Sequence, residues 1–141
     1  MIVLGILSVF VVLAWHWLGI FTVGLAFDAT LARLGPRGRV GHEIAFALAI
    51  LGLVTINFAD VVICAVLVQT FVGAMKFSDA FVFAIASFTT VGLTEPMPIT
   101  IPPITGPLIA MCGIVSFGWS TSFLVSCSRA ARMHDARKGE G

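Results

Sequence analysis

The chain has 141 residues, of which 59% are hydrophobic and only 11% are charged, and its net charge is +1. Soluble domains carry about 25% charged residues, so a water-soluble fold of this length could not cover so much apolar surface. The composition therefore excludes a soluble globular domain and indicates an integral membrane protein.

Three long segments are almost free of charge. Residues 2–27 and 104–128 contain no Lys, Arg, Asp or Glu, and residues 44–75 contain only Asp60. A membrane-spanning helix needs roughly 20 apolar residues, so each segment is long enough to cross a bilayer. The first segment lacks the positively charged start and the small-residue cleavage site of a signal peptide, so we expect it to be retained as a helix.

The placement of Lys and Arg predicts the orientation of these spans. Seven of the eight Lys and Arg residues lie between the first two spans or after the third, and only Lys76 lies on the opposite side. Short segments rich in Lys and Arg stay in the cytoplasm. We therefore expect the N-terminus and residues 76–103 outside, and the loop 28–43 and the tail 129–141 inside.

A short apolar segment, residues 78–88, lies between the second and third spans, and Ser78 or Asp79 could cap its start. An apolar stretch of about ten residues is too short to cross a bilayer and is typical of a re-entrant helix. Polar residues and four prolines follow, so we expect an extended strand that returns to the surface. Such non-helical backbone must be buried in protein or line a water-filled cavity. The negative end of the helix dipole would favour a cation there.

Three motifs in this region resemble potassium channels. Residues 89–92, Thr-Thr-Val-Gly, resemble the start of the potassium-channel filter, Thr-Val-Gly-Tyr-Gly-Asp. Residues 113–118, Gly-Ile-Val-Ser-Phe-Gly, resemble part of the inner helix of simple two-helix potassium channels. Residues 117–121, Phe-Gly-Trp-Ser-Thr, resemble a block of small bacterial three-span ion-channel proteins, in which an extra helix precedes the pore. The resemblance covers about residues 44–128 and implies a homotetramer in a bacterial inner membrane.

The resemblance implies an all-α fold and a role for each segment. Residues 1–43 would supply the extra helix and a cytoplasmic loop, and residues 129–141 a short basic tail. Between them would lie an outer helix over 44–75, a pore helix over 78–88, a filter over 89–95 and an inner helix over 104–128. The filter residues would be Thr89, Thr90, Val91, Gly92, Leu93, Thr94 and Glu95. The inner pore and hinge residues would be Gly113, Ile114, Phe117, Gly118, Thr121 and Val125.

The second half of the filter departs from the potassium-channel pattern. Leu93 replaces the Tyr and Thr94 the second Gly, whose backbone angles a β-branched residue reaches only at a cost. Gly92 and Thr94 with a following proline are similar to the Gly-Glu-Thr-Pro filter of cyclic-nucleotide-gated channels. That resemblance implies weak discrimination between K⁺ and Na⁺. We expect a monovalent cation channel of relaxed selectivity, with K⁺ or Na⁺ as the permeant ion and no other cofactor.

Two residues of this region have alternative interpretations. In a tetramer, Glu95 would form a ring of carboxylates that concentrates cations at the outer mouth. It could instead be a solvated surface charge. Gly113 matches the position of a gating hinge, whereas small residues on this helix could simply permit close helix packing.

Asp60 lies in the middle of the second span, with Asn57 three residues before it on the same helix face. An ionisable side chain at this depth costs at least about 2.5 kcal/mol, so it should face protein or water. His16 is near the centre of the first span, and antiparallel pairing of the two spans would bring it close to Asp60. A structural hydrogen bond or ion pair is the favoured interpretation, ahead of a proton-linked gate. One His and one Asp are too few ligands for a metal site.

The sequence contains no catalytic triad, nucleotide-binding glycine pattern or zinc-ligand cluster, so we expect no enzyme activity and no metal. Cys64, Cys112 and Cys127 fall inside the spans and are expected to serve as small packing residues. The expected partners are further copies of the chain, membrane lipid and monovalent cations, with no nucleic acid. Two other functions compete with the channel: a non-conducting scaffold with a degenerate filter, and a proton-coupled transporter built around Asp60. The absence of inverted repeats stands against the transporter.

Overall fold

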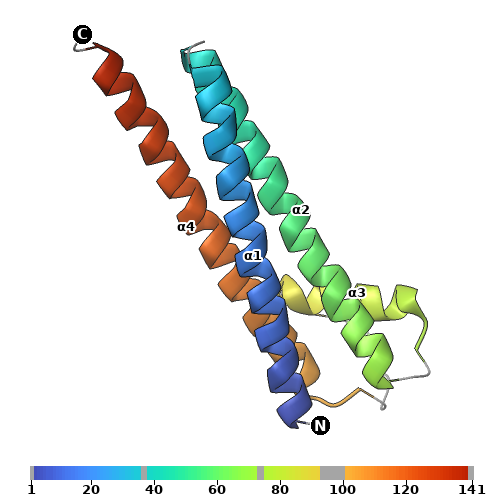
Figure 1. Ribbon diagram of the computed structural model, residues 1–141. Helices are drawn as coiled ribbons and strands as arrows, with labels where there is room; N and C mark the ends of the chain where they lie inside the picture. The colour runs from blue at the N-terminus through green and yellow to red at the C-terminus, as the bar shows by residue number, and fades with distance from the viewer. Residues whose placement is uncertain (1, 36–37, 73–74, 93–100, 140–141) are drawn as a thin grey trace. The chain divides into compact units, whose positions relative to one another are not determined.

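The computed structural model describes residues 2–35, 38–72, 75–92 and 101–139, and every regular element in these ranges is an α-helix. The four helices are α1 (Ile2–Leu34), α2 (Arg39–Val72), α3 (Phe77–Phe88) and α4 (Thr105–Gly139) (Figure 1). Three of them contain stretches long and apolar enough to cross a membrane, over Gly5–Leu34, Arg39–Phe71 and Thr105–Arg129. The prediction of an all-α fold with three helices long and apolar enough to span a membrane, plus one short helix, is confirmed.

The helices are longer than the apolar runs that predict them. α1 continues beyond residue 27 to Leu34 and α2 begins at Arg39, so helix replaces most of the loop expected over 28–43. α4 likewise extends through most of the expected tail, to Gly139. An apolar run marks where a helix lies in hydrocarbon, and charged residues can continue the same helix into water. The exposed pair of Arg39 Nε and Glu43 Oε1, 3.0 Å apart, supports the first turn of α2 in this way.

α3 begins one residue earlier than predicted. Its N-cap position is Lys76, whose side chain makes no capping hydrogen bond, and Ser78 and Asp79 lie inside the first turn instead of at the cap. The hydroxyl of Ser78 donates to Asp79 Oδ1 at 3.2 Å. The carboxylate of Asp79 still lies at the positive end of the helix dipole, where negative charge is favourable.

The chain forms two compact units. The first combines Met1–His16 with Asn57–Phe117, and the second combines Trp17–Ile56 with Gly118–Gly141. In the first unit α3 crosses the long helices instead of running along them (Figure 1). One face of α3 is buried at helical spacing, which anchors it in the core of this unit. The residues of that face are Ala80, Phe83, Ala84 and Phe88.

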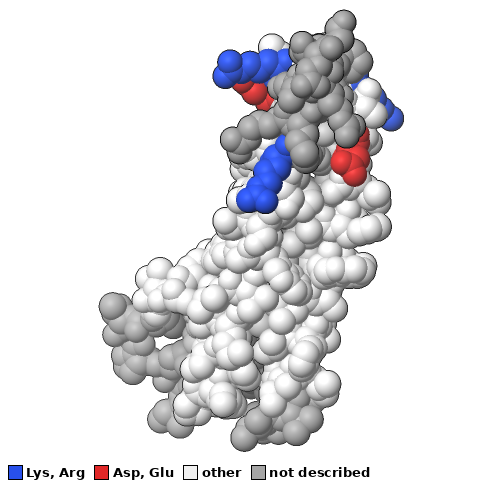
Figure 2. Space-filling view, turned by 90° about the vertical axis from the view of Figure 1, so that its left-hand side faces the viewer, with Lys and Arg blue, Asp and Glu red and all other residues white. Residues whose placement is uncertain are grey.

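The second unit has a smaller core of four buried residues, namely Phe27, Ala45, Ala49 and Cys127. The helices α1 and α2 approach closely here, because a Cβ added at Gly52 would lie 2.8 Å from Val23 Cγ2. On the face shown in Figure 2, charged side chains gather at one end. The unit contains Arg33 and Arg39, two of the cations that predict a cytoplasmic location for this end.

Candidate functional site

The candidate filter starts as a tight turn at the end of α3. The N–H and the hydroxyl of Thr89 both donate to the carbonyl oxygen of Ile85, at 3.0 and 2.7 Å. The N–H of Thr90 donates to Ser87 O at 3.0 Å. The N–H of Gly92 donates to the carbonyl oxygen of Ala86 at 3.1 Å, so the chain turns back toward α3. These bonds satisfy three carbonyl groups that the last turn of a helix would otherwise leave without partners.

Two residues of this turn have left-handed backbone conformations. Thr90 has φ of 59° and Gly92 has φ of 75°. Glycine adopts such angles freely, whereas a β-branched residue rarely does, and sparsely populated conformations cost on the order of 1–3 kcal/mol. The backbone therefore does not leave α3 as the extended strand that the sequence predicts. Strained residues of this kind persist where the surroundings fix them, and they gather at functional sites.

The turn is exposed on the surface of its unit. The residues Thr89, Thr90 and Gly92 are exposed, and the side chain of Val91 is 81% exposed. Thr89 and Thr90 bring hydroxyl groups, and the backbone from Thr90 to Gly92 is not helical. Polar, non-helical backbone is thus exposed directly beside the buried end of α3.

The position of this turn follows from the contact between α3 and α4. Gly113 packs against the backbone of Phe88, and a Cβ added at Gly113 would overlap the carbonyl oxygen of Phe88. The rings of Phe88 and Phe117 also meet edge to face, with centroids 5.5 Å apart. Gly113 lies eight residues into the span that begins at Thr105, which corresponds to about 12 Å along the helix axis. The end of α3 therefore packs against the interior of this candidate span and not against its end.

The predicted inner-pore residues form an exposed stripe on α4. Ile114 and Phe117 are exposed in the first unit, and Thr121 and Val125 are exposed in the second. Their spacing of three or four residues places them on one helix face. Exposed side chains of this kind suit contact with lipid as well as with a pore, so the pore-lining role stays a prediction.

Gly113 and Gly118 have different surroundings. Gly113 is buried against α3, whereas nothing lies within 4 Å of a Cβ added at Gly118. Of the two interpretations of Gly113, close packing is observed directly. Hinge motion stays a prediction.

The last three predicted filter residues, Leu93, Thr94 and Glu95, lie outside the described residues. The departure from the potassium-channel pattern and the carboxylate ring at Glu95 therefore stay predictions.

A buried polar pair joins α1 to α2 in the first unit. His16 Nδ1 lies 2.6 Å from Asp60 Oδ2, and both side chains are fully buried. The proximity expected from antiparallel pairing of the first two spans is thus observed. At this separation a proton lies between the nitrogen and the oxygen. Such a pair fixes the rotation of one helix against the other.

A buried hydroxyl that the sequence does not single out, that of Ser116, also lies in the first unit, and it makes no hydrogen bond within the described residues. Ser116 is fully buried on α4. Asn57 lies one turn before Asp60 on α2, as predicted from spacing, and its side-chain oxygen is buried. The available signal for Ser116 was a hydroxyl in a charge-free span, which is too common to identify a partner.

Metal ligation finds no support at this pair. The described residues contain no group of three or more His, Cys, Asp or Glu side chains that could hold a metal ion. His16 instead pairs with Asp60 Oδ2, which is the usual arrangement for ionisable side chains inside a membrane. Compared with known proteins, the chain matches no family model, no curated protein and no solved structure.

Proposed function

We propose that the protein is a cation channel in which several copies surround one pore, with the turn after α3 facing the axis. The observation that carries this proposal is the exposed, non-helical turn at Thr90–Gly92, which closely follows the contact of Phe88 with Gly113, about 12 Å along α4 from Thr105. Lipid cannot satisfy the polar groups of such a backbone, so other copies of the chain or water must cover it. A pore provides both. The resemblance to potassium channels suggests four copies.

The direction of α3 supports a preference for cations. Lys76 and Asp79 mark its N-terminal end, and the turn at Thr89 follows its C-terminal end. The aligned peptide dipoles place a partial negative charge, equivalent to about half an electron, at the C-terminus. Several copies would direct several such ends toward one axis. The hydroxyl groups and carbonyl oxygens of residues 89–92 would then replace water around a dehydrated cation.

Relaxed selectivity among monovalent cations completes the proposal. Leu93 and Thr94 stand where a potassium channel has Tyr and Gly, so the outer ion sites of such a filter would be absent. The inner sites near Thr90 and Gly92 would be retained, and Glu95 would attract cations at the mouth. In the orientation with an outer N-terminus, this mouth faces outward and the basic segment around Arg33 and Arg39 faces the cytoplasm. The proposed location is a bacterial inner membrane.

Ion flux from purified protein in liposomes tests this function. We expect K⁺ and Na⁺ to pass, and reversal potentials under bi-ionic K⁺/Na⁺ conditions to lie near zero. A strongly K⁺-selective reversal potential would contradict the relaxed filter. No flux would favour the non-conducting scaffold, and a flux that requires a proton gradient would favour the transporter.

A matched pair of glycine substitutions assigns the flux to the turn. Gly92 and Gly38 have similar backbone angles, with φ of 75° and 71°. A Cβ added at either position would have no neighbouring atom within 4 Å. Gly92→Ala and Gly38→Ala therefore introduce comparable backbone strain. We expect only Gly92→Ala to change the rate or ion preference of the flux, because Gly38 lies in the connection between α1 and α2. Equal effects of the two substitutions would remove the turn from the conduction path.

A further inference from the structure

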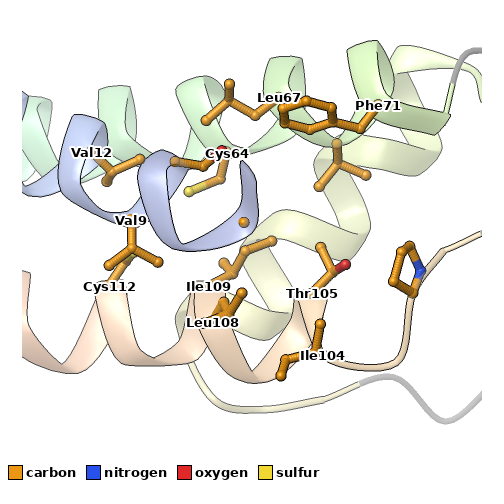
Figure 3. A pocket seen from close by; sticks show the side chains of 14 residues that line it. Val9, Val12, Cys64, Leu67, Phe71, Ile104, Thr105, Leu108, Ile109 and Cys112 are labelled. Atoms are coloured by element: carbon orange, nitrogen blue, oxygen red, sulfur yellow. The ribbon is translucent and has the colours of Figure 1, made fainter. Parts of the chain in front are cut away.

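The first unit contains a partly open cavity that the channel proposal does not use. It has a volume of about 120 Å³ and lies between α1, α2 and α4 (Figure 3). Its walls include Val9 and Val12 from α1, Cys64 and Leu67 from α2, and Ile109 and Cys112 from α4. We propose that this cavity binds the end of a lipid acyl chain.

The position of the cavity favours a hydrocarbon occupant. Its α1 wall begins at Gly5, its α2 wall ends at Phe71 and its α4 wall includes Thr105. Each of these three residues lies within one turn of an end of its helix. Each wall extends about seven residues inward from that end, which is about 10 Å of helix. The cavity therefore lies near one end of the three long apolar helices, where lipid tails would surround the protein in a bilayer.

The chemistry of the walls excludes a polar ligand. Among the described lining residues, only Ser8 and Thr105 carry hydroxyl groups. None of these lining residues is a Lys, Arg, His, Asp or Glu. An ordered water needs two to four polar partners, whereas apolar cavities of similar size stay dry and accept small apolar molecules. A lipid headgroup would find no charged partner. A hydrocarbon segment needs none and restores dispersion contacts to the wall atoms.

The size of the cavity limits how much of a lipid can enter. A cavity of about 150 Å³ accepts benzene, so 120 Å³ holds a short hydrocarbon segment and not a whole lipid. An entrance is available, because the lining residues Phe71 and Ile104 are both exposed. The tail end of a neighbouring lipid can therefore enter from the membrane while its headgroup stays at the surface.

Photo-crosslinking with a phospholipid tests the proposal. The probe carries a diazirine near the end of one acyl chain, and the protein is reconstituted in liposomes that contain it. We expect adducts on Ile109 and Cys112. Lipid that only surrounds the protein would not reach Cys112, which is 2% exposed, but would label Met111, which is 57% exposed on the same helix. A probe with its diazirine next to the headgroup should label neither Ile109 nor Cys112.

A cavity-filling variant provides the matched comparison. Val9 points into the cavity (Figure 3), whereas Val11, two residues away, is 56% exposed. We expect Val9→Phe to lower the adducts on Cys112 at least fivefold and Val11→Phe to leave them unchanged. If Val9→Phe does not fold, an excess of the same lipid without diazirine should produce the same fall in the unaltered protein. Adducts confined to exposed residues, or adducts on Cys112 that neither the variant nor the competitor lowers, would overturn the proposal.

Discussion

The contact between Gly113 and Phe88 yields a quantitative prediction for the substitution Gly113→Ala. The added methyl group would overlap the backbone carbonyl of Phe88, which cannot move aside as a flexible side chain can. Overpacking of this kind typically costs about 1–3 kcal/mol. Replacing Gly by Ala inside a helix also gains about 0.8–1.0 kcal/mol from helix propensity alone. The two contributions have opposite signs, so Gly113→Ala by itself would be difficult to interpret.

Gly118→Ala provides the reference that separates the two contributions. It makes the same substitution on the same helix, but nothing lies within 4 Å of its added methyl group. The propensity gain is common to both variants and cancels in their difference. We therefore expect Gly113→Ala to be less stable than Gly118→Ala by about 1–3 kcal/mol.

Unfolding titrations in mixed micelles of mild detergent and dodecyl sulfate, followed by tryptophan fluorescence, measure this difference. Ion flux in liposomes measures its consequence, because Phe88 directly precedes the exposed turn at Thr89. We expect Gly113→Ala to reduce the flux and Gly118→Ala to preserve the fold. Equal stability of the two variants would refute the packing argument. A change in flux without a change in stability would favour the hinge.

Three further predictions concern other parts of the site. Thr90→Gly should raise the free energy of unfolding by up to about 1–2 kcal/mol in the same micelle titration, because glycine adopts the left-handed conformation without strain; unchanged or lower stability would argue against strain at this position. His16→Ala and Asp60→Asn, alone and combined, should show a coupling energy of about 0.6–1.7 kcal/mol, the range for interhelical hydrogen bonds in membranes; additive effects would mean that the pair contributes no stability. Glu95→Gln should lower single-channel conductance at low salt and have little effect at high salt, where charge is screened; equal conductance at low salt would count against a carboxylate ring.

The sequence predicts the spans and the short helix well, because both are recognised from the length and composition of continuous apolar segments. Charge-free runs locate the three membrane-crossing helices, and the short run before Thr89 is distinctive because it cannot cross a bilayer. The pairing of His16 with Asp60 was also predictable, since few polar partners exist inside a membrane. Helix ends were less predictable. Membrane burial, and not helix formation, is what the apolar runs measure.

Features that depend on tertiary packing could not be predicted from the sequence. The backbone preference of a β-branched residue argues against a left-handed conformation at Thr90. Hydrogen bonds from the N–H groups of Thr90 and Gly92 to carbonyl oxygens of α3 fix that conformation. Gly113 attracts attention as a possible hinge, yet only its position against Phe88 shows the lack of space around it. The burial of the Ser116 hydroxyl likewise depends on how the helices are rotated.

The pair of His16 and Asp60 also has a consequence for biosynthesis. An aspartate near the middle of a helix makes membrane insertion less favourable by about 2.5–3.5 kcal/mol. Because α1 precedes α2 in the chain, His16 enters the membrane before Asp60 does. The first helix therefore offers the carboxyl group of Asp60 a hydrogen-bond partner while the second helix inserts into the membrane. A chain without α1 would have to insert α2 with its most polar residue unpaired.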